Sequence, residues 1–470
     1  MFTRFRKWLN VLSLLAGAFV VNACASYYQD HFDFNSEFEN GHLKQALETL
    51  KRKQTEGEGK TRFIYDVNKG LLLSILGEYA ESNEYFEKAF LFGEDYRINY
   101  VEEVASYFTN PNVTVYRGEN HEHLMLLYFK AINYLKMNKP EDALVECRRL
   151  NIRLNQLNDK YVSAEKFQRD AFVHTLMGII YQSTKDFNNA FIAYRNAVEV
   201  YENDYATLFG METPVQLKRD LLSTAWWTGF QDEFEKFKTK FEMQDFKVNE
   251  PEAELLFFWH NGLAPVKEEW SINFVIAPGA NNTMVFSNSE MGISFPFHVG
   301  EEKDRANLSK LEIFRVAFPR YRERPVYFES AHLETDGNSY KLEVAEDINK
   351  VAFLSLKQRM LQEFGKGLLR AAMKKATEHS LRKEDDRLGA VIGIVNALTE
   401  KADTRNWQTL PHGIYYSRVP LKEGTTPVKF TLQTGQRKTD YSFTYTAKKG
   451  QTLFHTFSSL ETATAPYRYY

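Results

Sequence analysis

Cysteine is almost absent from this chain of 470 residues, which contains only Cys24 and Cys147. So low a count excludes a disulfide framework and a cluster of cysteine metal ligands. If Cys24 carries a lipid, as argued below, Cys147 has no partner for a disulfide within the chain. Cys147 lies in a helical apolar pattern without the local signature of a nucleophile, so we predict a small buried thiol there.

The chain also lacks a large excess of positive or of negative charge. The chain has 59 basic and 62 acidic residues, a net charge of −3, which argues against a broad nucleic-acid surface. It has no glycine-rich phosphate loop, HExxH zinc motif, GxSxG elbow or EF-hand loop. In a strand, His121 and His123 would form a weak metal site. In a loop between helices they would form a solvated polar tip, which we favour because no third ligand is near. We predict no catalytic residue, metal or cofactor.

No apolar run is long enough to cross a bilayer comfortably. The longest near the N-terminus, Val11 to Val21, follows three basic residues and has the length of a signal-peptide core. It ends in VNAC, which resembles a bacterial lipobox and implies cleavage after residue 23 and acylation of Cys24. The alternatives are an ordinary signal peptide cleaved after Ala23 and an uncleaved anchor. Ala25, rather than aspartate, follows the cysteine, which implies the outer membrane as the location.

A helical repeat fills the N-terminal half, which we assign as residues 24–245. Three segments align on one helix–turn–helix template, beginning at Gly70, Ala131 and Gly178. In each segment a small residue starts the pattern, and a second helix is predicted at Tyr79, Pro140 or Phe187. Small residues let paired helices approach closely, and bulky residues fill the remaining groove. The spacing resembles the tetratricopeptide repeat (TPR), an architecture that binds peptides or proteins on a concave surface. A last helical pair is predicted near residues 214–243, with Trp226 and Trp227 packing at the end of the array.

Strands dominate the C-terminal half, assigned as residues 250–470. Short runs rich in β-branched and aromatic residues are bounded by glycine, asparagine and proline, which predicts an antiparallel β-sandwich. Asp336-Gly337 and Lys449-Gly450 predict hairpin turns. A helical insertion is expected at about residues 347–401. Its last part, residues 388–398, is almost wholly apolar and is either a buried helix or a helix that contacts the membrane or a partner. The chain is therefore predicted to be α+β and multidomain.

Two motifs in the C-terminal half resemble a largely uncharacterised family of bacterial tetratricopeptide-containing lipoproteins. The first is NGLAPVK and the second is ADTRNWQTLP, with FPRYRERP between them. The matching positions are Asn261, Gly262, Pro265, Lys267, Asp403, Thr404, Arg405, Trp407 and Pro411. The resemblance implies a role in the cell envelope, since members tend to occur beside lipoproteins similar to activators of penicillin-binding proteins. It implies no activity, and we interpret these residues as structural.

Two hypotheses about function follow. In the first, the chain is a lipid-anchored, periplasm-facing scaffold whose repeats bind another envelope protein, with the sandwich presented to a second partner or to peptidoglycan. In the second, the β domain is an enzyme or glycan-binding module, and Lys267, Glu268, Asp403 and Arg405 line one cleft. A weaker third hypothesis is an assembly accessory that inserts residues 388–398 into the membrane. Around the first motif we expect a strand at residues 255–259, a turn at Asn261-Gly262, and exposed side chains at residues 267–269.

Overall fold

The computed structural model of the protein describes residues 26–95, 115–160, 169–290, 292–311, 313–359, 368–369, 372–373, 375–376 and 402–462. Cys24 and residues 388–398 lie outside these ranges, so the acylation and the apolar helix stay predictions. Among the described residues, no helix is both long and apolar enough to span a bilayer.

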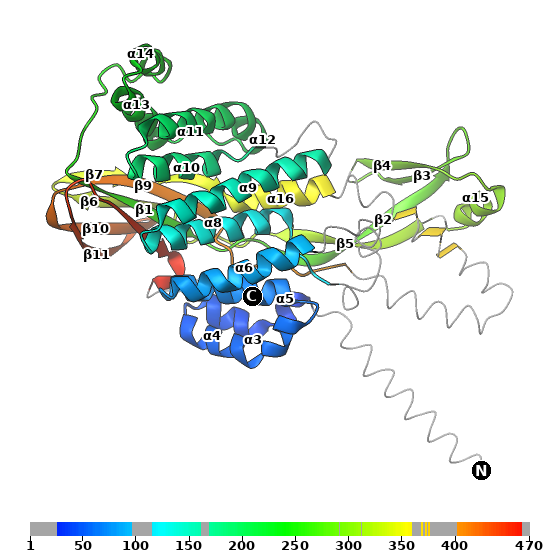
Figure 1. The fold of residues 1–470 in the computed structure, drawn as a ribbon. Helices are drawn as coiled ribbons and strands as arrows, with labels where there is room; N and C mark the ends of the chain where they lie inside the picture. The colour runs from blue at the N-terminus through cyan, green and yellow to red at the C-terminus, as the bar shows by residue number, and fades with distance from the viewer. Residues whose placement is uncertain are drawn as a thin grey trace.

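The N-terminal half is a stack of helix–turn–helix pairs (Figure 1). The short helix α2 (Tyr27–Asp30) precedes them. The pairs are α3 (Phe32–Glu39) with α4 (Leu43–Arg52), α5 (Arg62–Ile75) with α6 (Tyr79–Asp95), α8 (Asn120–Lys136) with α9 (Pro140–Lys160), α10 (Ala171–Ser183) with α11 (Phe187–Val200), and α13 (Val215–Thr228) with α14 (Gln231–Lys240). A 3₁₀ turn, η1 (Gln54–Glu58), follows α4, and a π-helical turn, η2 (Tyr201–Tyr205), leads into α12 (Ala206–Phe209). The second helices of the three predicted repeats begin at the predicted residues.

Close helix approach explains the small residues of the pattern. A Cβ atom on Gly178 would lie 2.4 Å from the ring of Tyr194, and one on Gly70 would lie 2.8 Å from the ring of Phe86. In the middle repeat Ala131 is fully buried and Cys147 is 1% exposed, which confirms the buried thiol. In the pairs α5–α6 and α10–α11, a large side chain of the second helix therefore packs against a glycine of the first.

Two four-stranded sheets form the predicted sandwich. One, here called the inner sheet, has the order β12 (Thr452–Ser458), β1 (Ala253–Asn261), β9 (Gly413–Leu421), β8 (Glu343–Asp347). The other has the order β11 (Arg437–Ala447), β10 (Gly424–Thr434), β6 (Ser330–Thr335), β7 (Asn338–Lys341). Residues of both sheets share one buried apolar cluster. All these pairings are antiparallel except that of β1 with β12.

The two predicted hairpins have different outcomes. Asp336 and Gly337 both have positive φ angles, 50° and 77°, and connect the paired strands β6 and β7. This hairpin is confirmed. The hairpin at Lys449-Gly450 is wrong, because β11 and β12 belong to different sheets and Gly450 lies where the chain crosses between them.

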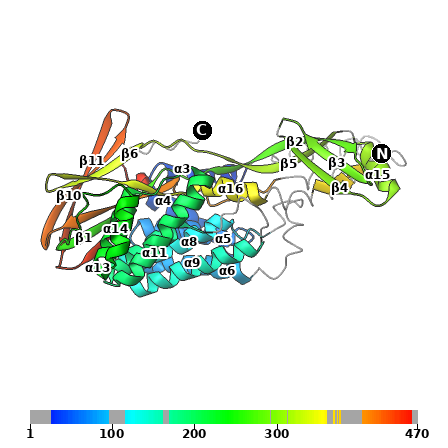
Figure 2. The ribbon, with the colours of Figure 1, turned by 90° about the horizontal axis from the view of Figure 1, so that it is seen from above.

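A third four-stranded sheet extends away from the sandwich, at the opposite end of the molecule (Figures 1 and 2). Its order is β4 (Ile293–His298), β3 (Thr283–Asn288), β2 (Val266–Pro278), β5 (Ile313–Arg322), with α15 (Glu302–Ser309) before β5. The sequence indicated these strands but not that they form a separate sheet. Of the predicted helical insertion, α16 (Ile348–Arg359) and the helical residues 368–369, 372–373 and 375–376 are described.

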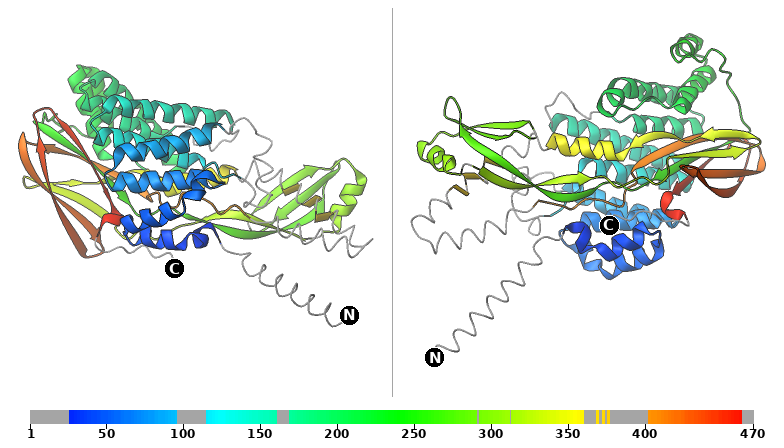
Figure 3. Two further views of the ribbon diagram at one scale, coloured as in Figure 1. Left: turned by 60° about the horizontal axis from the view of Figure 1, so that its bottom comes forward. Right: turned by 180° about the vertical axis from the view of Figure 1, so that it is seen from behind.

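The helical stack lies against the inner sheet, and β1 shows how (Figure 3). Leu255, Phe257 and Trp259 belong to the core of the sandwich. The alternate residues Leu256 and Phe258 belong to the core of the repeats. Successive side chains of a strand point to opposite faces, so a strand buried on both faces is apolar throughout. The inner sheet is thus shared by two cores, which joins the repeats to the β domain.

Candidate functional site

The second family motif lies along the face of the repeats that meets the β domain, here called the seam. Trp407 is fully buried, with its ring 6.0 Å from Phe86 of α6 and 6.1 Å from Phe129 of α8. Its backbone N–H donates to Glu122 at 2.6 Å, and its indole N–H donates to Thr409 at 2.8 Å. Apolar and polar contacts together fix this residue against two repeats.

Polar side chains on either side of Trp407 reach further helices. The Thr404 hydroxyl accepts from the Tyr27 N–H at 2.9 Å. The Gln408 amide donates to Asn35 of α3 at 2.7 Å. Thr409 donates to Asn68 of α5 at 2.6 Å. Residues 402–412 therefore lie across the helical half of the chain and contact helices from α2 to α8.

The first family motif lies beside the second. Asn406 donates to the carbonyl of Pro265 at 2.9 Å and accepts from the N–H of Lys267 at 3.2 Å. The Ala264 N–H donates to the Leu410 carbonyl at 2.7 Å. Gly262 has a φ of 66°, and a Cβ atom there would lie 2.9 Å from the Cβ of His412. The two motifs therefore lie side by side and are joined by hydrogen bonds, although they are far apart in the sequence.

The remaining motif residues serve the β domain. Asn261 donates to the carbonyl of Phe328 at 2.9 Å and accepts from Ser459 at 3.1 Å, so it links β1 to the segment before β6 and to the 3₁₀ turn η4 (Ser459–Glu461). Pro411 is buried just before β9 begins at Gly413. These contacts support the structural interpretation of both positions.

Lys267 was expected to be exposed, and this expectation is wrong. Its side chain is 2% exposed and is hydrogen-bonded to Glu119, which is itself buried. The ammonium lies 5.9 Å from the ring centre of Tyr116 and 5.5 Å from that of Tyr321. The strand alternation of β2 turns this lysine toward the repeats, where a charge is stable only if it is paired.

Asp403 and Arg405 form a bidentate ion pair next to Lys267. The Arg405 Nε and Nη2 atoms donate to the two Asp403 oxygens at 2.8 and 2.6 Å, and the guanidinium lies 5.2 Å from the ring centre of Tyr116. Burial would raise the pKa of Asp403, but the charge and hydrogen bonds of Arg405 outweigh burial and lower that pKa. The carboxylate is therefore ionised and paired.

Three of the four residues of the enzyme hypothesis thus converge around Tyr116. Glu268 does not: it is turned to the other face of β2 and pairs with the exposed Arg320 at 2.6 Å. The three that converge are bonded to each other or to Glu119, so their charges are satisfied within the protein. These pairs hold the side chains in fixed positions between the repeats and the β domain.

The histidines of the HEH motif are not a solvated tip. They lie in the first turn of α8, where His121 and His123 are each 3% exposed. Burial lowers the pKa of His121 to about 3. Between them, Glu122 accepts hydrogen bonds from Tyr116 (2.8 Å), the Glu119 N–H (2.9 Å) and the Trp407 N–H. Burial, and then the charge of Glu119, raise the pKa of Glu122 to about 7. In the described part of the chain, no three His, Cys, Asp or Glu side chains lie close enough together to hold a metal.

Sequence reasoning missed Arg324, a central residue of the seam. This arginine is 3% exposed and donates to the Ala264 carbonyl at 2.7 Å, to Glu39 of α3 at 2.7 Å and to the Gln408 carbonyl. It connects both motifs to the first repeat. Nothing in RYRER separates Arg324 from the exposed Arg320 and Arg322, because its partners lie 60 or more positions away.

A second set of buried charges lies where the inner sheet meets the later helices, from α10 to α13. Arg418 of β9 pairs with Asp220 of α13 at 2.9 Å and with Glu254 of β1 at 2.7 Å. The Tyr205 hydroxyl lies 2.8 Å from Glu346 and 3.2 Å from Asp170, and burial raises the pKa of both carboxyls. Polar contacts thus continue along the whole length of the repeats.

A match to a known protein family agrees with the helical architecture. The tetratricopeptide repeat family matches residues 173–204, which cover α10 and α11. Three solved structures are similar: the TPR-like repeats of a kinesin light chain from Podosopora anserina (14% identity, 45% of this chain and 91% of that chain, TM-score 0.30), MamA from Desulfovibrio magneticus RS-1 (16%, 46% and 95%, 0.28), and a tetratricopeptide repeat protein from Parabacteroides merdae (12%, 47% and 79%, 0.21). TM-scores this low carry no argument about function. No curated protein matches the chain.

The N-terminal half is therefore a TPR-like array, followed by antiparallel β-sheets. Such arrays are scaffolds for protein–protein contacts. In this chain the seam covers the face of the repeats that is turned toward the β domain.

Proposed function

We propose that the protein is a lipid-anchored scaffold of the cell envelope that binds other envelope proteins through the exposed outer faces of its repeats. The observation that carries this proposal is the seam, in which the chain's own motifs, Asn261–Lys267 and Asp403–Pro411, fill the inner face of the array. In a scaffold built in this way, the repeats and the sheets are held together, and the outer helices stay free to contact partners.

A binding role rather than a catalytic one fits the chemistry of the seam. Its charged groups are buried in pairs, Lys267 with Glu119 and Arg405 with Asp403. Buried pairs of this kind fix the relative position of two elements, because removing either partner leaves an uncompensated charge. We therefore do not assign an enzymatic activity to the β domain.

The anchor and the location rest on the sequence. The lipobox-like VNAC supports acylation of Cys24, and Ala25 supports the outer membrane with the folded part facing the periplasm. The sandwich is proposed to contact a second partner or peptidoglycan.

A pull-down tests the scaffold, and the full chain must be the bait. Isolated repeats would expose the apolar inner face and capture proteins non-specifically. Cells producing the tagged full chain are treated with a crosslinker, and captured proteins are compared with those from the C24S variant. The proposal predicts that specific envelope proteins are enriched with the wild type and that C24S loses both fatty-acid labelling and membrane association. Unchanged labelling of C24S would contradict the anchor, and a wild-type capture no different from an unrelated lipoprotein bait would contradict the scaffold.

A further inference from the structure

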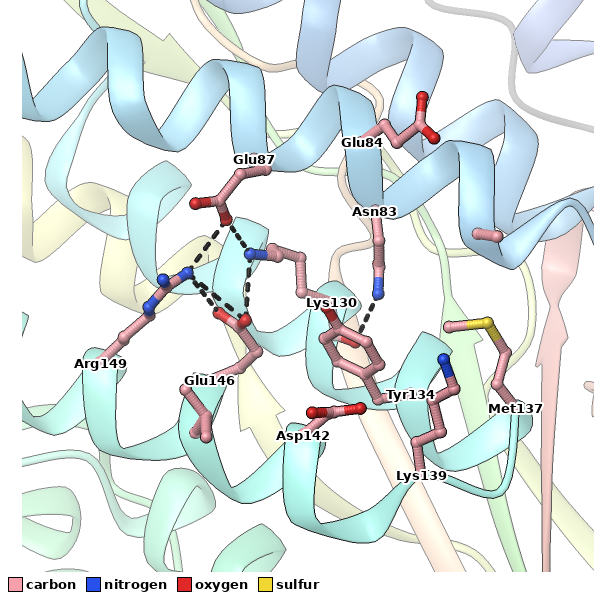
Figure 4. A pocket seen from close by; sticks show the side chains of 12 residues that line it. Asn83, Glu84, Glu87, Lys130, Tyr134, Met137, Lys139, Asp142, Glu146 and Arg149 are labelled. Atoms are coloured by element: carbon pink, nitrogen blue, oxygen red, sulfur yellow. Dashed lines mark hydrogen bonds and ion pairs between the residues drawn. The ribbon is translucent and has the colours of Figure 1, made fainter.

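The repeats carry a groove on the side that faces away from the β domain. Tyr128 of α8 bonds to His260 of β1 at 2.9 Å. Lys130 stands two positions later, and at 3.6 residues per turn it projects from the opposite side of the helix. There it lines a cavity of about 500 Å³ between α6, α8 and α9 (Figure 4).

Two facing stripes of residues define this outer groove. On α6 they are Ala80, Glu84 and Glu87, and on α9 they are Asp142, Val145 and Arg149. Residues three or four apart lie on the same face of a helix. The ion pair of Glu87 with Arg149, at 3.0 Å, bridges the two helices and sets their register.

At one end the charges compensate each other. Lys130 is 2% exposed and pairs with Glu87 and, at 3.0 Å, with Glu146. Arg149 joins the same two carboxylates. Burial would raise the pKa of Glu87, but the bonds and charges of Lys130 and Arg149 lower it. Two anions and two cations thus close the cavity at this end.

The other end is open and combines two carboxylates with one lysine. Glu84 and Asp142 are exposed at the rim, on the two facing helices; Asp142 lies beside the ring of Tyr134, whereas the carboxylate of Glu84 is turned away from that ring (Figure 4). Lys139 also borders the cavity, so the whole lining has four carboxylates and three basic groups, a net charge of −1. The pKa of Tyr134 is raised by burial and then by the charges of Glu146, Asp142 and Glu87. A cation placed over this ring would meet a negative field and an aromatic face.

Exposed apolar side chains stand on the same helix faces beyond the ion pair. Leu91 follows Glu87 by four positions and is 50% exposed, and Ile152 follows Arg149 by three positions and is 57% exposed. Val145 on the same stripe is 43% exposed. A small free amine would leave these side chains uncovered, whereas a polypeptide would cover them.

We propose that the outer groove binds a segment of a partner protein, with a lysine or arginine side chain in the cavity against Asp142 and Tyr134 and with Glu84 at the rim. An apolar side chain of the same segment would then cover Leu91 and Ile152. This inference rests on the proposed scaffold function and names the chemistry of its partner.

Peptide binding to the purified full-length protein tests the groove without any envelope partner. The probe is a labelled synthetic peptide with one lysine and, four residues later, one leucine, measured by fluorescence anisotropy. The double variant E84Q/D142N removes the two rim carboxylates. Its matched control is E81Q/E141Q, which makes the same charge change at exposed positions of the same helices outside the cavity lining.

We expect E84Q/D142N to bind the peptide about fivefold more weakly, as the loss of two partly screened charge contacts implies, and E81Q/E141Q to bind like the wild type. A peptide with glutamine in place of lysine should bind as weakly to the wild type as the lysine peptide does to E84Q/D142N. Equal affinity for the lysine and glutamine peptides, or equal loss in both double variants, would overturn the proposal. Either failure would leave the pull-down result intact, so the two proposals fail separately.

Discussion

His260 lies at the end of a buried strand and accepts or donates one hydrogen bond, to Tyr128. The sequence placed this histidine beside an amide, a lysine and two carboxylates, a combination that an active site also shows. Its partner is 132 positions away, and the partner of Lys267 is 148 positions away. The local sequence predicted the strand, because a strand depends on near neighbours; in place of the turn expected at Asn261-Gly262, β1 runs to Asn261 and a bend follows at Gly262. It could not predict which polar groups would be buried and paired.

Burial of His260 predicts a pH dependence of stability. Burial lowers the pKa of His260 in the folded protein to about 3, below the usual value of about 6.5 expected in the unfolded chain. The unfolded chain therefore binds a proton more readily, and stability is lost as the pH falls from about 6.5 toward 3. At pH 5 this one group should cost about 2 kcal/mol relative to pH 7.

Urea unfolding of the wild type and H260Q at pH 7 and pH 5 measures this effect. Glutamine can still bond to Tyr128 but does not titrate, so the loss between the two pH values should be about 2 kcal/mol smaller in H260Q. H298Q, at an exposed position of β4, is the control and should follow the wild type. Parallel pH profiles for H260Q and the wild type would contradict the assignment.

Trp407 gives a second prediction at this scale. Its ring is fully buried between α6 and α8, so W407A should lower the free energy of unfolding by about 3–5 kcal/mol. Trp226, which is 45% exposed, provides the control, and W226A should cost much less. Denaturant unfolding of both variants measures the difference. Equal losses would mean that the seam does not hold Trp407 as described.

At the scale of elements, the sequence pattern predicted how the helices pair. It predicted the strands as well, but not how they are divided among the sheets. Gly178 and Tyr194 stand at repeat positions that predict close packing, and they pack closely. By contrast, β2 leaves the sandwich and forms its own sheet, which no local pattern indicated. The same strand turns Lys267 toward the repeats and Glu268 toward solvent, so the placement of β2 decides which charge is buried.

Breaking the buried ion pair of Lys267 and Glu119 should therefore lower the free energy of unfolding strongly. K267M leaves the carboxylate of Glu119 uncompensated and should cost about 3–5 kcal/mol. The double variant K267M/E119L removes both charges and should recover most of that loss. The double-mutant cycle is measured by urea unfolding, with K422M as the control, because Lys422 pairs with Asp336 at the surface. If K267M were as mild as K422M, the pair would not be buried.

For the whole molecule, the inner sheet is the decisive feature. Its strands supply one face to the sandwich core and the other to the repeat core, as Leu255 and Leu256 illustrate. The sequence predicted a TPR-like half and a strand-rich half, but it predicted a concave surface open to partners. The structure shows the face of the repeats that meets the β domain covered by residues 402–412 and the inner sheet. The contacts that cover it join residues as far apart as Gln408 and Asn35, 373 positions, and no short-range pattern reports them.

Sharing of the inner sheet predicts that the two halves unfold together. Tryptophans report on both halves, Trp227 in the repeats and Trp259 in the sandwich. Urea transitions of the wild type followed by tryptophan fluorescence and by far-UV circular dichroism should coincide, because neither core is complete without the sheet. Two well-separated transitions would mean that the repeats and the β domain are independent units.

Hydrogen exchange of residues 402–412 tests most directly the claim that the chain fills its own repeat surface. The purified full-length protein, with no partner added, is followed by mass spectrometry, and the peptide that contains Trp407 is compared with peptides from α8. We predict that this peptide is protected to the same degree as α8, because the Trp407 N–H donates to the buried Glu122. Exchange as fast as in an unprotected loop would show that the inner face is open, and would contradict the account.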